Sequence, residues 1–571
     1  MKATDTQKIR ESMPRRDKLL TRWGQLKSER ATWWAHWQEI STYLLPRNGR
    51  FFVQDRDKGH RRHNAIYDNT ATRALRVLGA GMMAGATSPA RPWFRLATAD
   101  NDLNNYHPVR VWLAEVTKRM QTVFQKSNTY RALHQIYEEL GAFGTASCLV
   151  LPDFNNVIHL YPVTVGEFCI AHDFQGRVCT HYREFEKTVA EVVKEFGYEN
   201  CSLGTKNLYD QGNLDAWVTV IHAIEPRSDR DVTKRDNLNM PWRSCYFETG
   251  SDPGQYLRES GFDNFPVLAP RWSVSGGDIY GGSPGQEALG DIKGLQHKHL
   301  RLAQVIDYQT KPPLQVPSNM KNRDVETLPG GITFVDAASP QGGIRPAWEV
   351  GLNPQHLLGN IQDDRQRINS TFFADMFLML ANATDVRMTA TEVAERHEEK
   401  MLQLGPVLER LHDELLAPLI NLTFNYMLKA GIIPTIPEEL SGMDVQPQFV
   451  SVLAQAQRAI GANSVDRFML GVGQIAQLKP EVLDKVDADQ WVDDYSDMLG
   501  VNPKIIVDTQ EAAQLREARN RAMAAKEQAA ATQQTAASAA SLGSIDTSKK
   551  SALTDIMGMF SGYQSPTGVE V

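Results

Sequence analysis

The 571-residue sequence holds little that would support a disulfide framework, secretion or a membrane span. Its five cysteines are odd in number and include no C-x-x-C pair, so neither a zinc ribbon nor paired disulfides are expected, and a reducing compartment fits. The opening MKATDTQKIRESMPRRDK lacks the apolar core of a secretory signal, so no export is expected. The most membrane-like run, VLGAGMMAGA at 77–86, is well short of the roughly 20 residues of a spanning helix. Close packing between helices is expected instead.

Nucleotide and metal motifs are also missing. No Gly-Lys dipeptide occurs, so the chain lacks the phosphate-binding loop of a motor ATPase, and H-E-x-x-H is absent too. DNDLNN at Asp100 imitates an EF-hand loop, but Asn105 replaces its glycine and Val111 stands in place of its glutamate. An acidic cluster is more typical of a solvated helical face than of a metal site; its members are Asp487, Asp489, Asp493, Asp494 and Asp497. We expect no metal and no cofactor.

Excess positive charge is lacking as well. The formal net charge is -7 and the isoelectric point is about 6.1. Such a chain does not grip nucleic acid by neutralising many phosphates, because that mode of binding needs clustered lysine and arginine. Any contact with DNA should therefore be local or weak.

One short stretch, YGGSPGQEALGDI at 280–292, formally matches G-x-S-x-G around Ser283. A nucleophile elbow uses the backbone N–H of the residue after the serine in its oxyanion hole, and here that residue is Pro284, which has no N–H. The same residues fit a helix start, with Ser283 as N-cap, Pro284 in the first turn and Gln286 completing a capping box. The sequence favours the cap over a serine hydrolase, and we expect no catalytic residue.

Helical periodicity dominates the rest of the chain. RATWWAHWQEISTYLLP carries Trp33, Trp37, Ile40 and Leu44 on one face until Pro46, and core packing is the expected use of this stripe. Further helices are predicted at 71–86 and 109–126. From about 147 to 270, short alternating runs separated by turn residues predict an α+β module.

Two long helices are predicted to flank a small β excursion. The first follows Pro284 with a stripe through Ile292, His299 and Ile306, and Lys311-Pro312-Pro313 ends it. The segment between Pro312 and Leu352 is rich in Gly and Pro with strand-like pieces. The second helix opens with Asn353 as cap. Each has a narrow apolar stripe that cannot bury enough surface alone, which favours a ring of neighbouring copies.

The C-terminal half continues in helices. Thr389 caps a helix that runs to a stop at Gly431, with kinks expected at Pro406 and Pro418. Residues 508–542, rich in Ala and Gln, favour helix but supply almost no packing stripe, so they are expected to form either a barrel shared with other chains or a loosely fixed tail. Residues 543–571 are expected to be a flexible tail.

Several stretches together resemble the portal, or head-to-tail connector, of short-tailed double-stranded DNA phages. They are WWAHWQEISTYLLPRNGRF, DNTATRALRVLGAGMMAGATSPARPWFRL, YRALHQIYEELGAFGTASCLV, APRWSVSGGDIYGGSPGQEALGDIKGLQ and FVSVLAQAQRAIGANSVDRF. Each is weak alone, but their order and spacing over about 15–507 are specific. The Ala/Gln-rich end carries no such resemblance.

The resemblance implies a mixed α+β fold, predominantly α, with the wing, stem, clip and crown of the portal family. It assigns a wing to 1–282, stem helices to 283–310 and 354–376, a clip to 311–353 and a tunnel loop to 377–390. A long kinked helix would occupy 391–431 and the crown 432–507. Residues proposed to face the DNA channel are Asn382, Asp385, Arg387, Lys298, Arg365 and Arg367.

The family also implies partners and a place of action. The chain would form a ring of about twelve copies at one capsid vertex of the virion, assembled in the host cytoplasm. Double-stranded DNA would pass through it during packaging and ejection, without sequence-specific contacts. The terminase motor, tail adaptor proteins, and the capsid and scaffolding proteins would dock on it, and no membrane is involved. The alternatives are another virion head-tail adaptor protein, or a serine hydrolase using Ser283.

Overall fold

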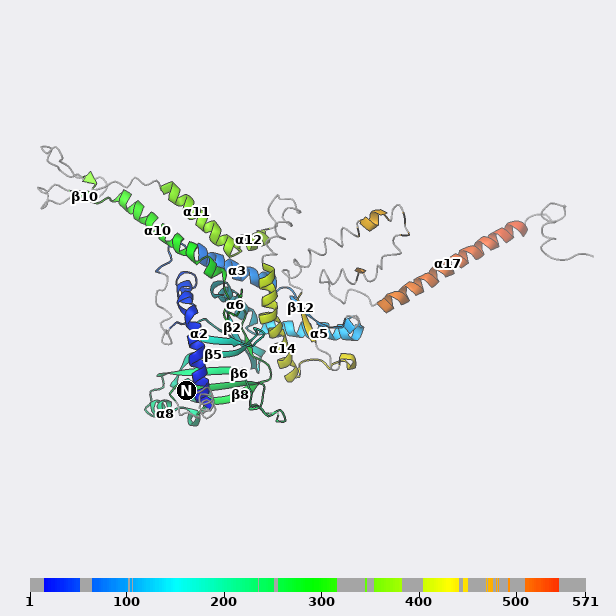
Figure 1. Cartoon of the computed structure of the whole chain (residues 1–571). Coiled ribbons are helices and arrows are strands. Elements are labelled where there is room, and N and C mark those ends of the chain that lie inside the picture. Colours follow the sequence, from blue (N-terminus) through cyan, green and yellow to red (C-terminus); the bar gives the residue numbers. More distant parts are fainter. Residues whose placement is uncertain are drawn as a thin grey trace, which may run out of the picture. The chain divides into compact units, whose positions relative to one another are not determined.

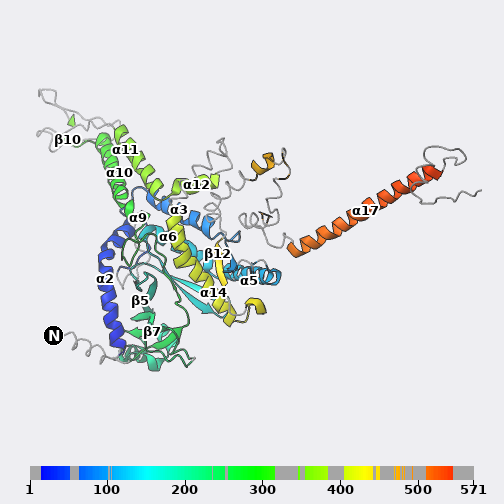
Figure 2. The ribbon, with the colours of Figure 1, turned by 45° about the vertical axis from the view of Figure 1, so that its right-hand side comes forward.

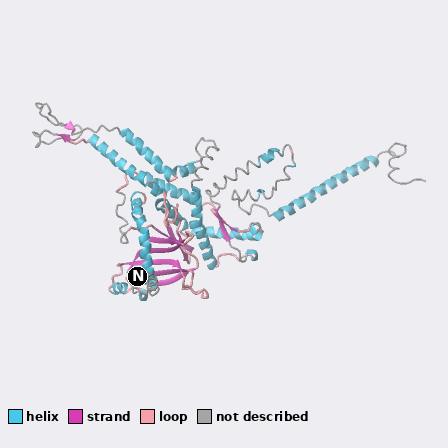
Figure 3. Cartoon of the chain, viewed as in Figure 1, coloured by secondary structure: helices cyan, strands magenta, loops and turns pink. Residues whose placement is uncertain are grey.

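The computed structural model describes most of the chain in two compact units, residues 1–471 and 472–571. The described residues are 15–51, 64–100, 103–104, 106–234, 236–250, 255–315, 345–346, 354–382, 404–440, 445–449, short pieces between 469 and 492, and 509–543. Within these residues far more of the chain is in helices than in strands, so the mixed, mostly helical fold predicted from the sequence is confirmed. The two larger sheets lie close together, and the β10–β11 pair lies apart from them at the far end of a pair of long helices (Figure 3).

A five-stranded antiparallel sheet forms the α+β module, in the order β4-β5-β6-β7-β8. Its strands are β4 (Phe168–His172), β5 (Val178–Thr188), β6 (Trp217–Pro226), β7 (Trp242–Glu248) and β8 (Arg258–Phe262). The long helix α2 (Arg15–Tyr43) runs along this sheet (Figures 1 and 2). Trp23 of α2 stacks on Tyr182 of β5 at 6.1 Å between ring centroids. The apolar face of α2 is therefore buried on one face of the sheet.

The predicted tryptophan stripe is part of this helix. Trp37, Ile40 and Leu44 are fully buried, and Trp33 is half-buried against them. The helix begins at Arg15, well before the stretch expected from the sequence. The extension from Arg15 carries Leu19, Trp23 and Leu26, which are buried against the five-stranded sheet. At the start of the predicted stretch, the buried guanidinium of Arg30 donates hydrogen bonds to the carbonyls of Gly166 (2.9 Å) and Phe168 (2.7 Å).

On the other face of the sheet lies the short helix α7 (Val189–Phe196), and α8 (Leu203–Asp210) follows it, with Thr205 hydrogen-bonded to Glu248 at the end of β7. Thr188 and Glu191 form a complete capping box at the start of α7. Phe196 of α7 packs with Phe185, Val220 and Tyr246 of the sheet. Each face of the sheet thus has its own apolar cluster.

A three-stranded sheet, in the order β3-β2-β9, joins the module to the helical core. Its strands are β2 (Ser147–Asp153), β3 (Val157–Val163) and β9 (Val267–Leu268), and β2 begins where the sequence predicted a strand. The core helices beside it are α3 (Thr70–Ala86), α5 (His107–Lys126) and α6 (Thr129–Phe143). Helices α3 and α5 match the helices predicted at 71–86 and 109–126 to within two residues.

The small residues of 77–86 serve close helix packing, as expected. A Cβ on Gly79 would lie 2.9 Å from the Glu138 side chain of α6, and one on Gly81 would lie 2.2 Å from the Phe377 ring. Phe377 belongs to α12 (Ala374–Asn382). Within the described residues, no helix is long and apolar enough to cross a bilayer.

Two long helices pack side by side: α10 (Leu289–Thr310) and α11 (Pro354–Thr371) (Figures 1 and 2). The single stem helix expected at 283–310 is broken, because the one-turn helix α9 (Pro284–Glu287) ends at Ala288 before α10 begins. Of the β excursion expected between α10 and α11, only β10 (Leu314–Gln315) and β11 (Arg345–Pro346) are described, and they pair antiparallel. Asn353, predicted as the cap of α11, lies outside the described residues.

The C-terminal part of the first unit returns to the core. Residues 404–411 are helical, His412–Leu416 form a π-helical turn, and α14 spans Ala417–Lys429. A π turn directly precedes Pro418, which lies in the first turn of α14. The kinks expected at Pro406 and Pro418 stay a prediction. Gly431 follows with φ of 67°, in agreement with the predicted stop. Strand β12 (Val445–Phe449) pairs with β1 (Phe94–Thr98).

The second unit contains one long helix, α17 (Thr509–Gly543). It covers the predicted Ala/Gln-rich helix almost residue for residue. Its described side chains are exposed apart from half-buried Ala512. The predicted acidic cluster around 487–497, the cap Thr389 and the tail from 544 lie outside the described residues.

Candidate functional site

The helix pair α10–α11 is the main candidate site, because it begins in the core and then becomes exposed. Leu289, Ile292 and Leu295 at the start of α10 are buried, whereas Ile306 near its end is 51% exposed. On α11 the order is reversed: Leu358 near the start is 49% exposed, and Ile368 near the end is fully buried. The apolar stripe predicted from the sequence is thus buried over only part of each helix within this chain.

An ion-pair network joins the two helices. Asp364 of α11 is 2% exposed and accepts a hydrogen bond from Lys298 Nζ of α10 at 2.7 Å. Arg367 bonds to the other oxygen of Asp364 and lies 3.5 Å from Asp291 of α10. The buried carboxylate of Asp364 therefore has cations from both helices, which offsets the cost of burying it.

A second network ties α11 to the start of α3. Asp68 is buried and its Oδ2 accepts bonds from Arg365 Nη2 at 2.7 Å and from Nε at 2.9 Å. His299 Nε2 of α10 lies 2.8 Å from the same oxygen. Burial alone would raise the pKa of Asp68, but hydrogen bonds from Thr70 and the Arg365 guanidinium outweigh it and hold that pKa below its usual value.

These networks bear on the predicted channel residues. Lys298, Arg365 and Arg367 all pair with carboxylates of the same chain, so their charges are largely compensated before any phosphate approaches. Asn382 is the last residue of α12, and its side chain is not described. Asp385 and Arg387 lie outside the described residues. That these six residues face a channel stays a prediction.

Ser283 is the N-cap of α9. Its Oγ accepts a hydrogen bond from the Gln286 backbone N–H at 3.0 Å and donates one to the Ala142 carbonyl at 2.8 Å. The expected capping box with Gln286 is only half formed, because the Ser283 side chain caps the helix but no bond returns from the Gln286 side chain to the Ser283 backbone N–H. With Ser283 only 2% exposed and its hydroxyl proton on a carbonyl, the residue is a structural cap rather than a poised nucleophile.

The glycines around Ser283 serve packing. A Cβ on Gly285 would lie 2.5 Å from the Ala142 carbonyl oxygen at the end of α6. A Cβ on Gly281 would lie 2.4 Å from the carbonyl oxygen of Gly144, which has φ of 76°. The G-x-S-x-G match therefore arises because two backbone segments approach closely here.

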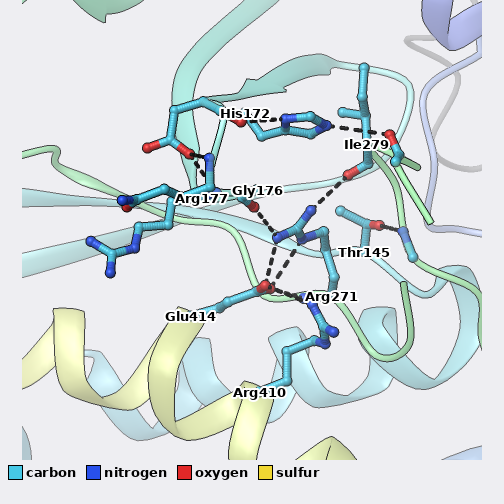
Figure 4. Close-up of polar contacts among 12 residues, drawn as sticks. Thr145, His172, Gly176, Arg177, Arg271, Ile279, Arg410 and Glu414 are labelled. Atoms are coloured by element: carbon cyan, nitrogen blue, oxygen red, sulfur yellow. Dashed lines mark hydrogen bonds and ion pairs between the residues drawn. The ribbon is translucent and has the colours of Figure 1, made fainter. Parts of the chain in front are cut away.

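Arg271 and Glu414 form a buried ion pair that the sequence did not reveal (Figure 4). The Arg271 side chain is 4% exposed and donates from Nη2 to Glu414 Oε1 at 2.6 Å and from Nε to Oε2 at 3.2 Å. Nη2 also donates to the Gly176 carbonyl at 2.7 Å, and Arg410 Nη1 donates to Glu414 Oε1 at 3.2 Å. The pair ties the π turn to the loop before α9 and to the β4–β5 turn.

A cavity of about 370 Å³ lies beside α6. Its lining includes Arg47, Arg50, Glu139, Thr164 and Glu167. Burial raises the pKa of Glu139 to about 8, and the negative charge of Glu167 adds to this effect. Within the described residues, no group of His, Cys, Asp and Glu side chains has the arrangement to hold a metal ion.

Comparison with known proteins gives consistent matches along the chain. A family model described as bacteriophage head to tail connecting protein matches residues 16–507. The chain is 60% identical over 545 residues to the probable portal protein of Bordetella phage BPP-1, covering 95% of this chain and 98% of that one. It is 45% identical over 542 residues to the portal protein of Salmonella phage epsilon15, again covering 95% and 98%.

A solved structure also overlaps loosely. It is the neck of an empty GTA particle computed with C6 symmetry, with a TM-score of 0.37 and 11% identity. The match covers 81% of this chain and 98% of the other. The overlap is too loose to support an argument about fold or assembly.

Proposed function

The chain belongs to the bacteriophage head-to-tail connecting protein family, and from this premise we propose that it forms a ring through which the phage genome is packaged and ejected. Portal proteins are structural proteins of the virion and not enzymes. The ring would contain twelve copies. The terminase motor, tail adaptor proteins, and the capsid and scaffolding proteins would dock on it at successive stages.

One observation supports the ring most directly: the free parts of α10 and α11 carry an apolar stripe that this chain leaves uncovered. Ile306 is about half exposed, although it continues the stripe that is fully buried at Ile292. Leu358, next to the half-buried stripe residue Leu357 on α11, is also about half exposed. Exposed apolar area at helical spacing gains free energy when another helix covers it. In a ring, the covering helix comes from the neighbouring copy.

The charge of the chain suits a conduit for DNA. Twelve copies would carry 12 × -7, a formal charge of about -84. Phosphates release few counterions on such a surface, so DNA meets no deep binding well and can slide. The ion pairs of Lys298, Arg365 and Arg367 act in the same direction, because a compensated cation holds a phosphate weakly.

The experiment that tests the proposal replaces Ile306 by Glu. A charge on the exposed stripe should prevent ring formation but leave the protomer folded, since the side chain is 51% exposed. Leu214→Glu is the matched control, because Leu214 is 41% exposed in a loop far along the chain from α10. Mass photometry and electron microscopy give the readout. Rings of unchanged number and size in Ile306→Glu would contradict the proposed role of this stripe.

A further inference from the structure

A row of stacked side chains crosses the five-stranded sheet on the face opposite α2. The strand registers place Arg183 of β5 opposite His222 of β6, His222 opposite Tyr246 of β7, and Tyr246 opposite Arg258 of β8. The rings of His222 and Tyr246 are parallel, 3.8 Å apart. Arg258 lies over the Tyr246 ring at 4.7 Å. The row therefore has an arginine at each end and aromatic rings between them.

Arg183 is buried without a counterion. Arg183 is 8% exposed. Its Nε is buried and has no hydrogen-bond partner. Among the described residues, the side chain of Arg183 takes part in none of the ion pairs and none of the hydrogen bonds. Buried charges in proteins are normally paired, because an unpaired one loses hydration and gains nothing in return. The terminal nitrogens are the atoms through which another group can reach this guanidinium.

Two aromatic rings hold the guanidinium in place. Its Cζ lies 4.5 Å from the Phe185 ring centroid and 4.9 Å from that of Tyr161, which projects from the edge strand β3. Tyr161 is 47% exposed, so this side of the clamp is at the surface. Aromatic rings offset only part of the cost of burying a positive charge, but they fix the plane in which the guanidinium N–H groups point. A fixed fork suits two parallel hydrogen bonds to one carboxylate.

The polar groups that face Arg183 do not supply negative charge. His181 and His222 are fully buried and bond through Nε2 to Ser147 and Ser244 at 3.0 Å each. Burial, with the nearby charge of Arg183, lowers the pKa of His181 to about 3 and that of His222 well below its usual value. Both rings are therefore neutral at pH 7. The local surface stays cationic.

We propose that Arg183, clamped between Tyr161 and Phe185, binds a carboxylate side chain of a neighbouring copy of this chain. The inference rests on the proposed ring and names one of its contacts. The surface of a neighbour offers many carboxylates, because the chain has 68 acidic residues against 61 basic ones. In a closed ring each copy presents a different face to the copy on either side, so the cation and its carboxylate lie on opposite flanks of the protomer.

The test compares the full-length chain with Arg183→Met, Arg183→Lys and the control Arg177→Met. Met keeps the unbranched apolar stem and removes the charge, and Lys keeps the charge but loses the fork. Arg177 is exposed near the β4–β5 turn of the same sheet. Mass photometry across a protein and salt titration gives the concentration at which half of the chains are in rings. Urea unfolding of the unassembled protomer gives its own stability.

Arg183→Met should raise the concentration at which half of the chains are in rings by roughly tenfold or more. It should also make that concentration depend less on salt. Arg183→Lys should fall between it and the wild type, and Arg177→Met should match the wild type. The isolated Arg183→Met protomer should be at least as stable as the wild type, because it no longer buries an unpaired charge.

Two outcomes would overturn it. If Arg183→Met assembles at the wild-type concentration with the wild-type salt dependence, no carboxylate of a neighbour binds there. If the variant instead destabilises the isolated protomer, the partner of Arg183 lies within the same chain. A wild-type chain that forms no ring under any condition would defeat the proposed function itself, which is a separate result.

Discussion

Arg271 and Glu414 lie 143 residues apart in the chain and are joined by three hydrogen bonds, two from the guanidinium and one from the Arg271 backbone N–H, in a buried ion pair. Glu414 sits in the π turn between the helical residues 404–411 and α14, and Arg271 sits in the loop that leads to α9. One side chain thus fixes the C-terminal helices against the segment from which α10 begins (Figure 4).

Glu414→Gln should destabilise the protomer by about 3 kcal/mol. The substitution keeps the shape of the side chain but leaves the Arg271 guanidinium, 4% exposed, without its charged partner. Urea unfolding checks the value. Asp263→Asn is the control, because it breaks a surface pair with Lys429 and should cost less than about 1 kcal/mol. Equal losses of unfolding free energy in the two variants would show that the buried pair contributes no more to stability than the surface pair.

Gly285→Ala should destabilise the protomer by at least about 1–3 kcal/mol, because the new Cβ would meet the Ala142 carbonyl oxygen at 2.5 Å. Gly290→Ala, two residues into α10, is the matched substitution. Its Cβ meets nothing within 4 Å, so the better helix propensity should stabilise by about 0.5–1 kcal/mol. Thermal unfolding gives both signs. Shifts of the same sign would refute the packing role of the glycine cluster.

Ser283→Ala should cost the protomer about 1 kcal/mol through the lost cap and leave ring assembly intact. The reason is that the Ser283 hydroxyl binds only backbone groups of α6 and α9. Unfolding midpoints and mass photometry of the same preparation check both parts. A hydrolytic activity present in the wild type and lost in this variant would restore the rejected serine-hydrolase alternative.

Glu139 should make the protomer less stable as pH rises from about 5 to 8. The folded protein holds the proton on Glu139 up to a pKa of about 8, whereas the unfolded chain releases it near 4.5. Between these values the folded state binds more protons, so its stability falls with pH, by at most about 1.4 kcal/mol per unit from this residue. Urea unfolding at four pH values measures the slope.

Glu139→Gln is the diagnostic variant for this slope. It mimics the protonated carboxyl, so it should remove this part of the pH dependence and gain stability relative to the wild type toward pH 8. The exposed Glu29→Gln on α2 should leave the slope unchanged. If Glu139→Gln keeps the wild-type slope, the buried carboxyl is ionised in the folded protein, contrary to the account.

The sequence predicted the elements that local periodicity determines. The stripe of Trp37, Ile40 and Leu44 is buried as expected, because one face of the helix packs into the main hydrophobic core. The start of α9 at Ser283 follows from local capping chemistry, and so does the end of α14 before Gly431. Each of these depends on residues within a turn or two of one another.

Contacts between distant segments could not be predicted in this way. The Arg271–Glu414 pair, the pairing of β1 with β12 and the row from Arg183 to Arg258 depend on how strands and helices meet in space. The break between α9 and α10 was missed because the apolar stripe continues through Ala288. The π turn was missed because proline positions pointed to kinks at Pro406 and Pro418.

Helices α10 and α11 form the wall of a channel only when copies of this chain associate side by side in a ring. Electron microscopy of the purified full-length protein, with its mass measured in solution, tests it most directly. The account predicts closed rings near 12 × 64.0 kDa, or about 768 kDa. A solution that holds only the 64.0 kDa protomer, stably folded under conditions that permit assembly, would contradict it.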